Sequence, residues 1–232
     1  MKWREWEELP KGMQKPEVRE YYEILSRRRF SLKVKRIFDV TVAAVMLVAF
    51  CPLLIILSVL IKLDSKGSVF YRQERVTAYG KKFRIHKLRT MVADADRIGT
   101  SVTVDGDSRI TRVGFFLRKY RLDEVPQLID VLKGDMSFVG ARPEVPKYVE
   151  KYTDEMKATL LLPAGITSEA SIRYKDEAEL LNGAEDVDKV YVERVLPGKM
   201  KYNLERIKRF SFINDFAVMP RTVSVVFEKN YK

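Results

Sequence analysis

Residues 40–61 read Val-Thr-Val-Ala-Ala-Val-Met-Leu-Val-Ala-Phe-Cys-Pro-Leu-Leu-Ile-Ile-Leu-Ser-Val-Leu-Ile, a run of 22 residues without a charged side chain. A helix needs about 20 apolar residues to cross the hydrocarbon core of a bilayer, so this run is long enough. Hydropathy alone therefore favours an ordinary transmembrane helix. The run is not a cleavable signal peptide, because it begins about 40 residues into the chain and is followed by Lys62 and Asp64 rather than by small residues.

Two features of the same run favour a bent helix that enters and leaves the membrane on one side. Pro52 removes a backbone hydrogen bond near the middle, which divides the run into arms of about 12 and 9 residues. The longer arm reaches about 18 Å, short of a hydrocarbon core of about 30 Å. Basic residues also crowd both flanks, and the positive-inside rule then places both ends on the cytoplasmic side. They are Arg27, Arg28, Arg29, Lys33, Lys35 and Arg36 before the run, and Lys62, Lys66, Arg72 and Arg75 after it.

Length and composition are consistent with one domain joined to this membrane element. The chain has 232 residues, with 43 Lys and Arg against 32 Asp and Glu, and a net charge of +11. That charge suits an anionic membrane, a polyphosphate substrate or nucleic acid equally well. A single cysteine excludes an internal disulfide, and no paired Cys/His spacing indicates a zinc site. We expect a domain in a reducing, cytoplasmic environment.

A second stretch, Arg118-Lys-Tyr-Arg-Leu-Asp-Glu-Val-Pro-Gln-Leu-Ile-Asp-Val-Leu-Lys-Gly134, sets two adjacent carboxylates among arginines. Asp123 is a favourable N-cap, and a short helix over about 124–133 should follow it and end at Gly134. The start of such a helix offers unpaired N–H groups to a phosphate. Nearby arginines could grip phosphate oxygens and keep Asp123 ionised as a nucleophile. They are Arg109, Arg112, Arg118, Arg121 and Arg142. The simpler alternative is a capping acid followed by a solvated one.

Between these two stretches the sequence predicts a β hairpin. Residues 69–76 and 83–89 are short β-like runs joined by a turn at Tyr79-Gly80. The second run carries Lys87 and Arg89, which are either active-site cations or a solvated or lipid-facing basic strand. His86 is the only histidine and has no identifiable acid–base partner, so we expect a structural role for it.

The rest of the chain reads mostly as helices and loops. Helices are expected over 144–161, 175–181, 187–195 and 201–210, separated by Pro163-Ala-Gly165, Asn182-Gly183 and Pro197-Gly198. Residues 92–108 are polar and rich in turn formers, which indicates a loop. Residues 1–33 read as an amphipathic or loosely ordered lead-in, and their aromatic residues either sit at the headgroup level or pack on the domain.

Taken together, the motifs resemble those of the bacterial sugar transferases called monotopic phosphoglycosyl transferases. The resemblance spans roughly residues 33–230, in the family's order. It rests on Lys35-Arg-Ile-Phe-Asp39, the apolar run, Ile61 to Arg75, Phe83 to Met91, Arg109 to Gly114, Leu122 to Leu128, Leu132 to Gly140, Ala141-Arg-Pro143 and Gly165-Ile-Thr167.

The resemblance implies an α-rich α+β fold. It would comprise a lead-in over 1–33, a re-entrant membrane helix over 34–62 broken at Cys51-Pro52, and a small cytoplasmic-face catalytic domain over 63–232. That domain would contain the β hairpin and interfacial amphipathic helices, including parts of 200–216. The protein would lie in the bacterial inner membrane as a monotopic enzyme.

The resemblance also implies the reaction. Sugar 1-phosphate would pass from a UDP-sugar to polyprenyl (undecaprenyl) phosphate, releasing UMP, in the first membrane step of exopolysaccharide, O-antigen or glycoprotein glycan assembly. Asp123 would form a covalent phosphosugar intermediate and ligate Mg²⁺, and Glu124 would accept a proton or order the acceptor. Residues implied to bind substrate are Arg118, Arg112, Arg142, Lys87, Arg89 and Arg173.

The chain departs from the family pattern at several positions. Cys51 stands for the usual serine before Pro52, Arg121 for a serine or threonine, and Ala141 for a proline. An arginine is missing before Gly165-Ile-Thr167, and Arg173 or Lys199 could replace its grip on the nucleotide sugar. Two further classes of function stay open at this level. One is a non-catalytic basic protein that binds anionic lipids or a partner. The other, a nucleic-acid-binding module, lacks any zinc-finger, RNP or basic-zipper signature.

Overall fold

A computed structural model of the chain describes residues 3–95, 107–181, 184 and 186–228. It is mainly helical with a few short strands, which confirms the α-rich α+β class. The helices are α1 (Pro16–Ser26), α2 (Arg29–Asp64), α3 (Arg112–Lys119), α4 (Leu128–Lys133), α5 (Pro146–Val149), α6 (Glu169–Arg173), α7 (Glu177–Leu180), α8 (Val187–Val190), α9 (Leu196–Lys208) and α10 (Phe212–Glu228). The strands are β1 (Phe70–Tyr71), β2 (Glu74–Val76), β3 (Lys82–Arg84), β4 (Lys87–Leu88), β5 (Met136–Val139) and β6 (Ala164–Thr167). Most of the loop expected at 92–108 and the break expected at Asn182-Gly183 lie outside the described residues.

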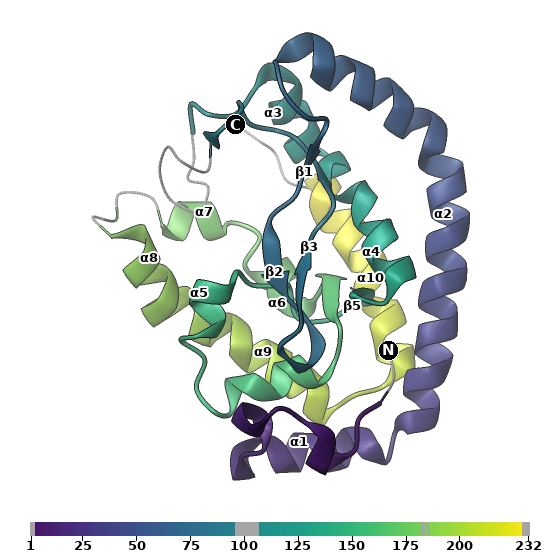
Figure 1. Ribbon diagram of the computed structural model, residues 1–232, viewed down its shortest axis with the longest axis vertical. Coiled ribbons are helices and arrows are strands. Elements are labelled where there is room, and N and C mark those ends of the chain that lie inside the picture. Colours follow the sequence, from purple (N-terminus) through teal and green to yellow (C-terminus); the bar gives the residue numbers. More distant parts are fainter. Residues whose placement is uncertain (1–2, 96–106, 182–183, 185, 229–232) are drawn as a thin grey trace.

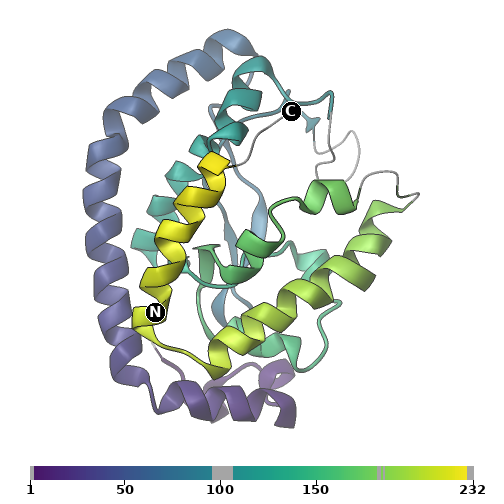
Figure 2. The same ribbon diagram turned by 180° about the vertical axis from the view of Figure 1, so that it is seen from behind.

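Helix α2 forms a long arc along one edge of the molecule, from α1 at one end to α3 at the other (Figures 1 and 2). It continues through Pro52, so the break expected at Cys51-Pro52 is wrong, and the helix begins at Arg29 rather than at residue 34. Within the described residues it is the helix long and apolar enough to cross a membrane. Its first half packs on α4, and its second half packs on α3. Several of its apolar side chains are exposed, and Val45, Val48 and Ile55 are each more than 60% exposed. Both ends of this apolar helix therefore rest on the same domain.

The first turns of α2 are fixed by buried ion pairs, which explains the Lys35 to Asp39 motif. The Asp39 carboxylate accepts a hydrogen bond from the Ser137 hydroxyl of β5 at 2.7 Å. Lys35 Nζ lies 3.5 Å from Asp39 and 3.2 Å from Asp215 of α10. Arg206 of α9 pairs with the same Asp215 at 2.8 Å. Because buried charges are tolerated only when they are paired, this network joins α2, β5, α9 and α10 in one register.

The strands form three two-stranded sheets, two of which build the predicted hairpin region. β2 pairs antiparallel with β3 and β1 with β4, so the hairpin is confirmed. Its turn contains Tyr79 with φ 58° and Gly80 with φ 73°. The expectation that His86 lacks an acid–base partner is wrong, since its backbone N–H and its Nδ1 both bond to the buried carboxylate of Asp130. A structural role for His86 stays a prediction. β5 and β6 pair in parallel beneath α4 and α10.

The N-terminal segment packs on the domain. Leu9, Met13, Tyr21 and Leu25 are buried in one cluster with residues of α9 and of the 3₁₀ turn Met156–Leu161. The rings of Trp3 and Trp6 both pack against Tyr22, the first tilted and the second edge-on, with ring centroids 5.2 Å apart in each pair. Of the two placements considered for these aromatic side chains, the structure supports packing on the domain.

Two of the helices expected from the sequence differ in the structure. The prediction of a single helix over 144–161 is wrong, because only α5 and the 3₁₀ turn Met156–Leu161 form there. The hydroxyl of Thr153 accepts the backbone N–H of Met156, and such local bonds compete with a continuing helix. The break at Pro197-Gly198 is also wrong. Pro197 follows the π-helical turn Tyr191–Val195 and sits in the first turn of α9, where a missing N–H costs little.

The expectation that residues 200–216 lie at a lipid interface is wrong for its first part. Met200, Leu204 and Ile207 of α9 are buried in the core of the domain. Exposed apolar side chains begin only in α10, where Ile213 is 78% and Phe216 is 45% exposed. The apolar stripe of α9 is thus used for internal packing, which the sequence pattern does not distinguish from lipid contact.

Candidate active site

The two adjacent carboxylates lie where α3 turns into α4. Between these helices the chain forms a 3₁₀ turn, Leu122–Gln127, that contains both Asp123 and Glu124. Arg121 begins the turn in the left-handed conformation, with φ 55° and ψ 21°. The expectation that Asp123 is an N-cap is therefore wrong, because it lies inside the turn and makes no capping bond. The predicted end of the helix at Gly134 is confirmed, with φ 86°.

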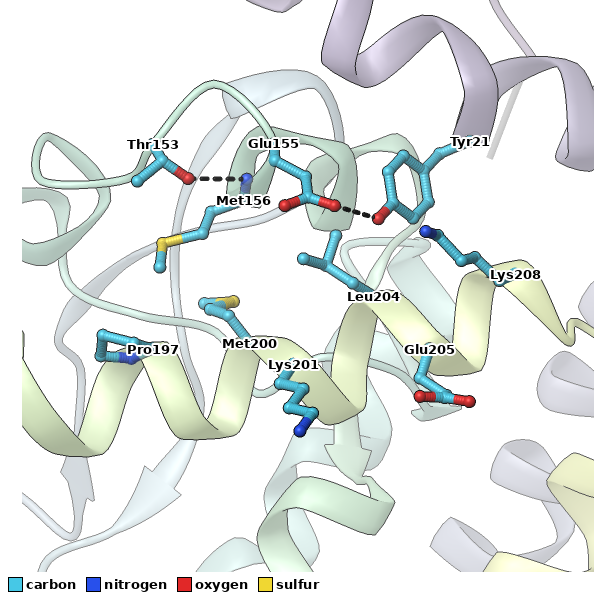
Figure 3. Close-up of a pocket in the computed structure, with 10 residues that line it drawn as sticks. All are labelled: Tyr21, Thr153, Glu155, Met156, Pro197, Met200, Lys201, Leu204, Glu205 and Lys208. Carbon is cyan, nitrogen blue, oxygen red and sulfur yellow. Dashed lines mark hydrogen bonds between the residues drawn. The ribbon is translucent and has the colours of Figure 1, made fainter.

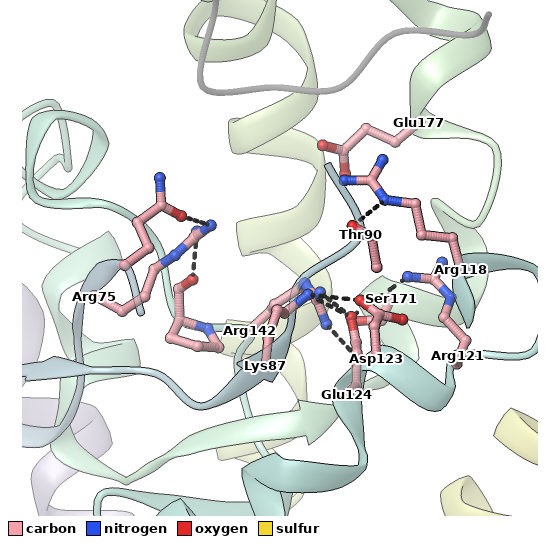
Figure 4. A network of polar contacts seen from close by, with 12 residues as sticks. Arg75, Lys87, Thr90, Arg118, Arg121, Asp123, Glu124, Arg142, Ser171 and Glu177 are labelled. Atoms are coloured by element: carbon pink, nitrogen blue, oxygen red, sulfur yellow. Dashed lines mark hydrogen bonds and ion pairs between the residues drawn. The ribbon is translucent and has the colours of Figure 1, made fainter. Parts of the chain in front are cut away.

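Cations from distant parts of the sequence surround these carboxylates (Figure 4). Lys87 of β4 places Nζ 2.9 Å from Glu124 Oε1 and 3.6 Å from Asp123 Oδ2. Arg142, which follows β5, donates from Nη2 to Glu124 Oε1 at 2.5 Å and from Nη1 to Oε2 at 3.3 Å. Arg121 Nη1 lies 3.5 Å from the same Oε1. The hairpin, the 3₁₀ turn and the segment after β5 thus meet at one point.

A close contact between two glycines positions Arg142. Gly140 directly follows β5 and Gly165 lies within β6; the N–H of Gly165 donates to Ala141 O at 2.8 Å and that of Gly140 donates to Thr167 O at 3.0 Å. A Cβ on Gly165 would overlap the backbone of Gly140. The missing side chains therefore allow the two strands to approach closely where the chain leaves β5 toward Arg142.

Asp123 has the features of a reactive carboxylate. It is 6% exposed, and its Oδ1 is buried without a hydrogen-bond partner among the described residues. Burial raises the pKa of Asp123 above its usual value, and the nearby Glu124 adds to this effect, while Lys87, Arg121 and Arg118 oppose it. An ionised Asp123 consequently carries an incompletely solvated oxygen, which favours attack on an electrophile.

Glu124 has the opposite character, although it is the next residue and equally buried. Burial disfavours its ionised form, but Arg142, Lys87 and Arg121 together outweigh burial and hold its pKa well below the usual value. Both of its carboxylate oxygens accept hydrogen bonds from Arg142. Glu124 is thus a permanent anion that keeps Lys87 and Arg142 in place, and it is poorly suited to take up a proton.

The remaining candidate arginines differ in their placement. Arg118 is at the site, where its Nε donates to the Thr90 hydroxyl at 2.9 Å and its charge acts on Asp123. Arg112 is exposed in the first turn of α3. Arg89 points away, because its guanidinium donates to the carbonyls of Ile61, Ser65 and Lys66 at the end of α2. Although Arg89 is close to Lys87 in sequence, its side chain therefore stabilises the C-terminal end of α2.

Arg173 and Lys199 are both engaged elsewhere. Arg173 pairs with Glu169 at 2.9 Å and lies over the Tyr202 ring. Lys199 is 5% exposed and donates to Glu177 at 3.0 Å, to the Tyr191 hydroxyl at 2.9 Å and to Glu144 at 3.4 Å. With all its protons donated, Lys199 is not placed to grip a nucleotide. The hypothesis that it replaces the missing family arginine is not supported.

Glu144, the buried acid among the partners of Lys199, was not predicted from the sequence as a site residue. Glu144 is 5% exposed and accepts a 2.6 Å hydrogen bond from the Tyr191 hydroxyl. Burial opposes its ionisation, but Lys199 and Tyr191 hold its pKa below the usual value. Arg75 donates to the neighbouring Pro143 carbonyl at 3.1 Å. The only sequence signal was that Glu144 directly follows the Ala141-Arg-Pro143 motif, so this network supports the segment that carries Arg142.

A groove of about 270 Å³ lies elsewhere, between α1, residues 153–156 and α9 (Figure 3). Tyr21 and Glu155 form a 2.5 Å hydrogen bond across its rim. Lys201, Glu205 and Lys208 line the side formed by α9. It contains neither Asp123 nor Glu124 and shares no lining residue with the cluster around them. The carboxylate pair is therefore the stronger candidate for chemistry.

Comparison with known proteins identifies the family to which this site belongs. The family model described as "Bacterial sugar transferase" matches residues 30–229. The chain belongs to the bacterial sugar transferase family. The match includes all of α2 except Arg29, and every residue placed around Asp123, so the site is built within the family's own domain.

Individual relatives of this bacterial sugar transferase agree. A Bacillus subtilis protein named putative undecaprenyl-phosphate N-acetylgalactosaminyl 1-phosphate transferase is 42% identical over 64% of the chain and 82% of its own length. A Caulobacter vibrioides protein named UDP-glucose:undecaprenyl-phosphate glucose-1-phosphate transferase is 35% identical over 82% of the chain and 68% of its length. An Aeromonas hydrophila N-acetylgalactosaminephosphotransferase is 34% identical over 83% of the chain, which spans 43% of that relative.

Proposed function

We propose that this sugar transferase moves a sugar 1-phosphate from a UDP-sugar to polyprenyl phosphate and releases UMP. The observation that carries the proposal is Asp123, a buried carboxylate with one unpartnered oxygen beside Lys87, Arg118, Arg121 and Arg142. Relatives named for undecaprenyl-phosphate sugar phosphotransfer support the two substrates. Two relatives named as exopolysaccharide production proteins support a role in polysaccharide assembly.

The reaction divides into two displacements at one phosphorus atom. An oxygen of Asp123 attacks the phosphorus that bears the sugar, and the bond from that phosphorus to the UMP oxygen breaks. Arg118 and Arg142 are close enough to Asp123 to stabilise the negative charge that moves onto UMP. An oxygen of polyprenyl phosphate then attacks the same phosphorus, and the Asp123 carboxylate is regenerated.

In this scheme Glu124 orders cations and does not transfer a proton. The second pKa of a phosphate monoester is about 6, so the acceptor is largely a dianion at neutral pH and needs no base. Glu124 is itself held ionised by Arg142, Lys87 and Arg121. Of the two roles considered from the sequence, accepting a proton is disfavoured by this environment, and ordering the acceptor stays a prediction.

A magnesium ion fits the proposed site through Asp123. Among the described residues no group of three or more His, Cys, Asp or Glu side chains is arranged to hold a metal. Magnesium commonly uses one or two protein carboxylates together with substrate phosphates, and the unpartnered Oδ1 of Asp123 is such a ligand. When bound, the ion would offset the charge of the diphosphate.

We further propose that α2 enters the cytoplasmic leaflet and returns to the same side. Its two halves pack on α4 and on α3 of one domain, and basic residues flank both ends. Its outward side chains, including Val45, Val48 and Ile56, are exposed and apolar. A helix of 36 residues is about 54 Å long and can hold both ends on one domain only if it curves, as α2 does (Figure 1).

The test is UMP formation from a panel of UDP-sugars by detergent-extracted protein with undecaprenyl phosphate and Mg²⁺. We expect the wild type to release UMP with a matching donor and Asp123→Asn to release none. Without acceptor, the wild type should form UMP equal to the amount of enzyme and gain the mass of one phosphosugar on the peptide that contains Asp123. Equal UMP release by wild type and variant would show that Asp123 is not the nucleophile.

A further inference from the structure

Helix α3 presents two chemically different faces. Leu117 is fully buried, and Arg118 turns inward to the Thr90 hydroxyl at 2.9 Å. On the other face Phe115, Phe116 and Tyr120 are 56%, 50% and 38% exposed. The rings of Phe116 and Tyr120 pack together with centroids 4.9 Å apart. Adjacent exposed aromatic rings on a short helix indicate a surface that contacts something apolar.

This aromatic face adjoins the membrane helix. The carboxylate of Asp64, the last residue of α2, accepts the backbone N–H of Val113 at 3.0 Å and so fixes the start of α3. Leu57 and Ile61 of α2 pack around Leu117. In the last turns of α2, Leu60 is 42% and Leu63 is 79% exposed. Apolar side chains thus continue from the end of α2 onto α3.

The same face lies within a short distance of the proposed nucleophile. Tyr120 precedes Asp123 by three residues, so their Cα atoms are at most about 11 Å apart. Each of the two residues has a cation beside it: Lys119 Nζ lies 5.7 Å from the centroid of the Tyr120 ring, and the charge of Arg118 acts on Asp123. A phosphate bound at Asp123 whose hydrocarbon tail points to the membrane would therefore place the first carbons of that tail near α3.

We infer that Phe116 and Tyr120 bind the isoprene units next to the phosphate of the acceptor lipid. The inference rests on the proposed function and adds to it a binding surface for the acceptor chain. The competing occupant is the acyl chain of any surrounding lipid. The two differ in one respect: a specific tail site acts on a prenyl phosphate even when no bilayer is present.

The experiment compares Phe116→Ser and the double variant Phe116→Ser, Tyr120→Ser with wild type in detergent, using a prenyl phosphate of four isoprene units. We expect the KM for this acceptor to rise about tenfold in the double variant, because one isoprene-sized apolar contact is lost. UMP formation without acceptor should be unchanged, because the first displacement does not use the lipid.

Ile213→Ser is the matched control, since Ile213 is an exposed apolar residue of α10 at 78% exposure. It should leave the KM for the four-unit acceptor unchanged. An unchanged KM in the α3 variants, together with normal UMP formation, would overturn the inference and assign the face to bulk lipid. If the wild type forms no UMP from any donor, the proposed function itself fails. Thermal unfolding of each variant distinguishes a binding effect from misfolding.

Discussion

Asp123 and Glu124 are neighbours with equal burial, but their surroundings give them opposite properties. Among the described residues Asp123 has one salt-bridge partner, Lys87 at 3.6 Å, whereas Glu124 has Arg142, Lys87 and Arg121 within 3.5 Å. Burial therefore raises the pKa of Asp123, while cations depress that of Glu124. At the residue scale the site separates a reactive carboxylate from a structural one.

This difference predicts opposite effects on stability. Glu124→Gln should lower the free energy of unfolding at pH 7 by about 3 kcal/mol, because it leaves buried cations short of a partner. Asp123→Asn should leave stability unchanged or higher, because the ionised form of this carboxylate is disfavoured in the fold. Chemical denaturation of both variants in detergent checks this. The stability contributed by Glu124 should be present above pH 4.5 and should be lost as the pH falls further.

The charge of Lys87 should affect how the rate of the reaction depends on pH. In the proposed mechanism Asp123 must be ionised to attack, so we expect activity to fall as the pH drops below the pKa of Asp123. The charge of Lys87 lowers that pKa, and Lys87→Met should therefore move the acidic limb of the kcat/KM profile to higher pH. We also expect a loss of about 10²-fold in kcat, typical of removing a group that stabilises transition-state charge. Lys82→Met, which changes a lysine whose side chain is 61% exposed, should leave the limb in place.

At the scale of elements, α2 is joined to the domain by charge as well as by apolar packing. Asp39 lies between Lys35 and the Ser137 hydroxyl and is 3% exposed. Asp39→Ala should lower the free energy of unfolding by about 3–5 kcal/mol, because Asp215 would then have to compensate the buried charges of both Lys35 and Arg206. Glu23→Ala, which removes an exposed ion pair with Arg19, should change it by less than about 0.5 kcal/mol. Equal losses in both variants would contradict this account of the network.

The close contact between Gly140 and Gly165 in the β5–β6 pair leads to a second prediction at this scale. Gly165→Ala places a methyl group against the backbone of Gly140, which cannot move without separating the strands. We expect a loss of stability of about 1–3 kcal/mol and a loss of activity, because Arg142 follows Gly140 by two residues. Gly12→Ala meets no atom within 4 Å and should be neutral. Thermal melts and UMP release measure the two effects, and a neutral Gly165→Ala would show that the contact is not tight.

For the whole molecule, the arrangement of α2 predicts its topology. In a Cys51→Ser background, Lys33→Cys and Lys66→Cys mark the two flanks of the apolar segment, and both positions are exposed. If α2 returns to its starting side, an impermeant thiol reagent added to inside-out membrane vesicles should label both cysteines. In intact spheroplasts neither should react. Labelling on opposite sides would show that α2 crosses the membrane.

Local sequence was sufficient for the features that depend on neighbouring residues. The hairpin around Tyr79-Gly80 and the helix end at Gly134 follow from turn chemistry, and both are confirmed. Helix limits were less predictable. Thr153 interrupts the helix expected over 144–161, and α9 continues through Pro197, because local hydrogen bonds and a π turn changed the outcome at these points.

The sequence by itself determined the chemistry available: an uncharged apolar segment, an Asp-Glu pair and an excess of basic residues, in motifs that match one family. Tertiary structure decided which cations serve the site, since Lys87 and Arg142 reach Glu124 while Arg89 closes the end of α2. It also gave Asp123 and Glu124 their different properties. The physical reason is that burial and charge depend on distances across the fold, which spacing along the chain does not specify.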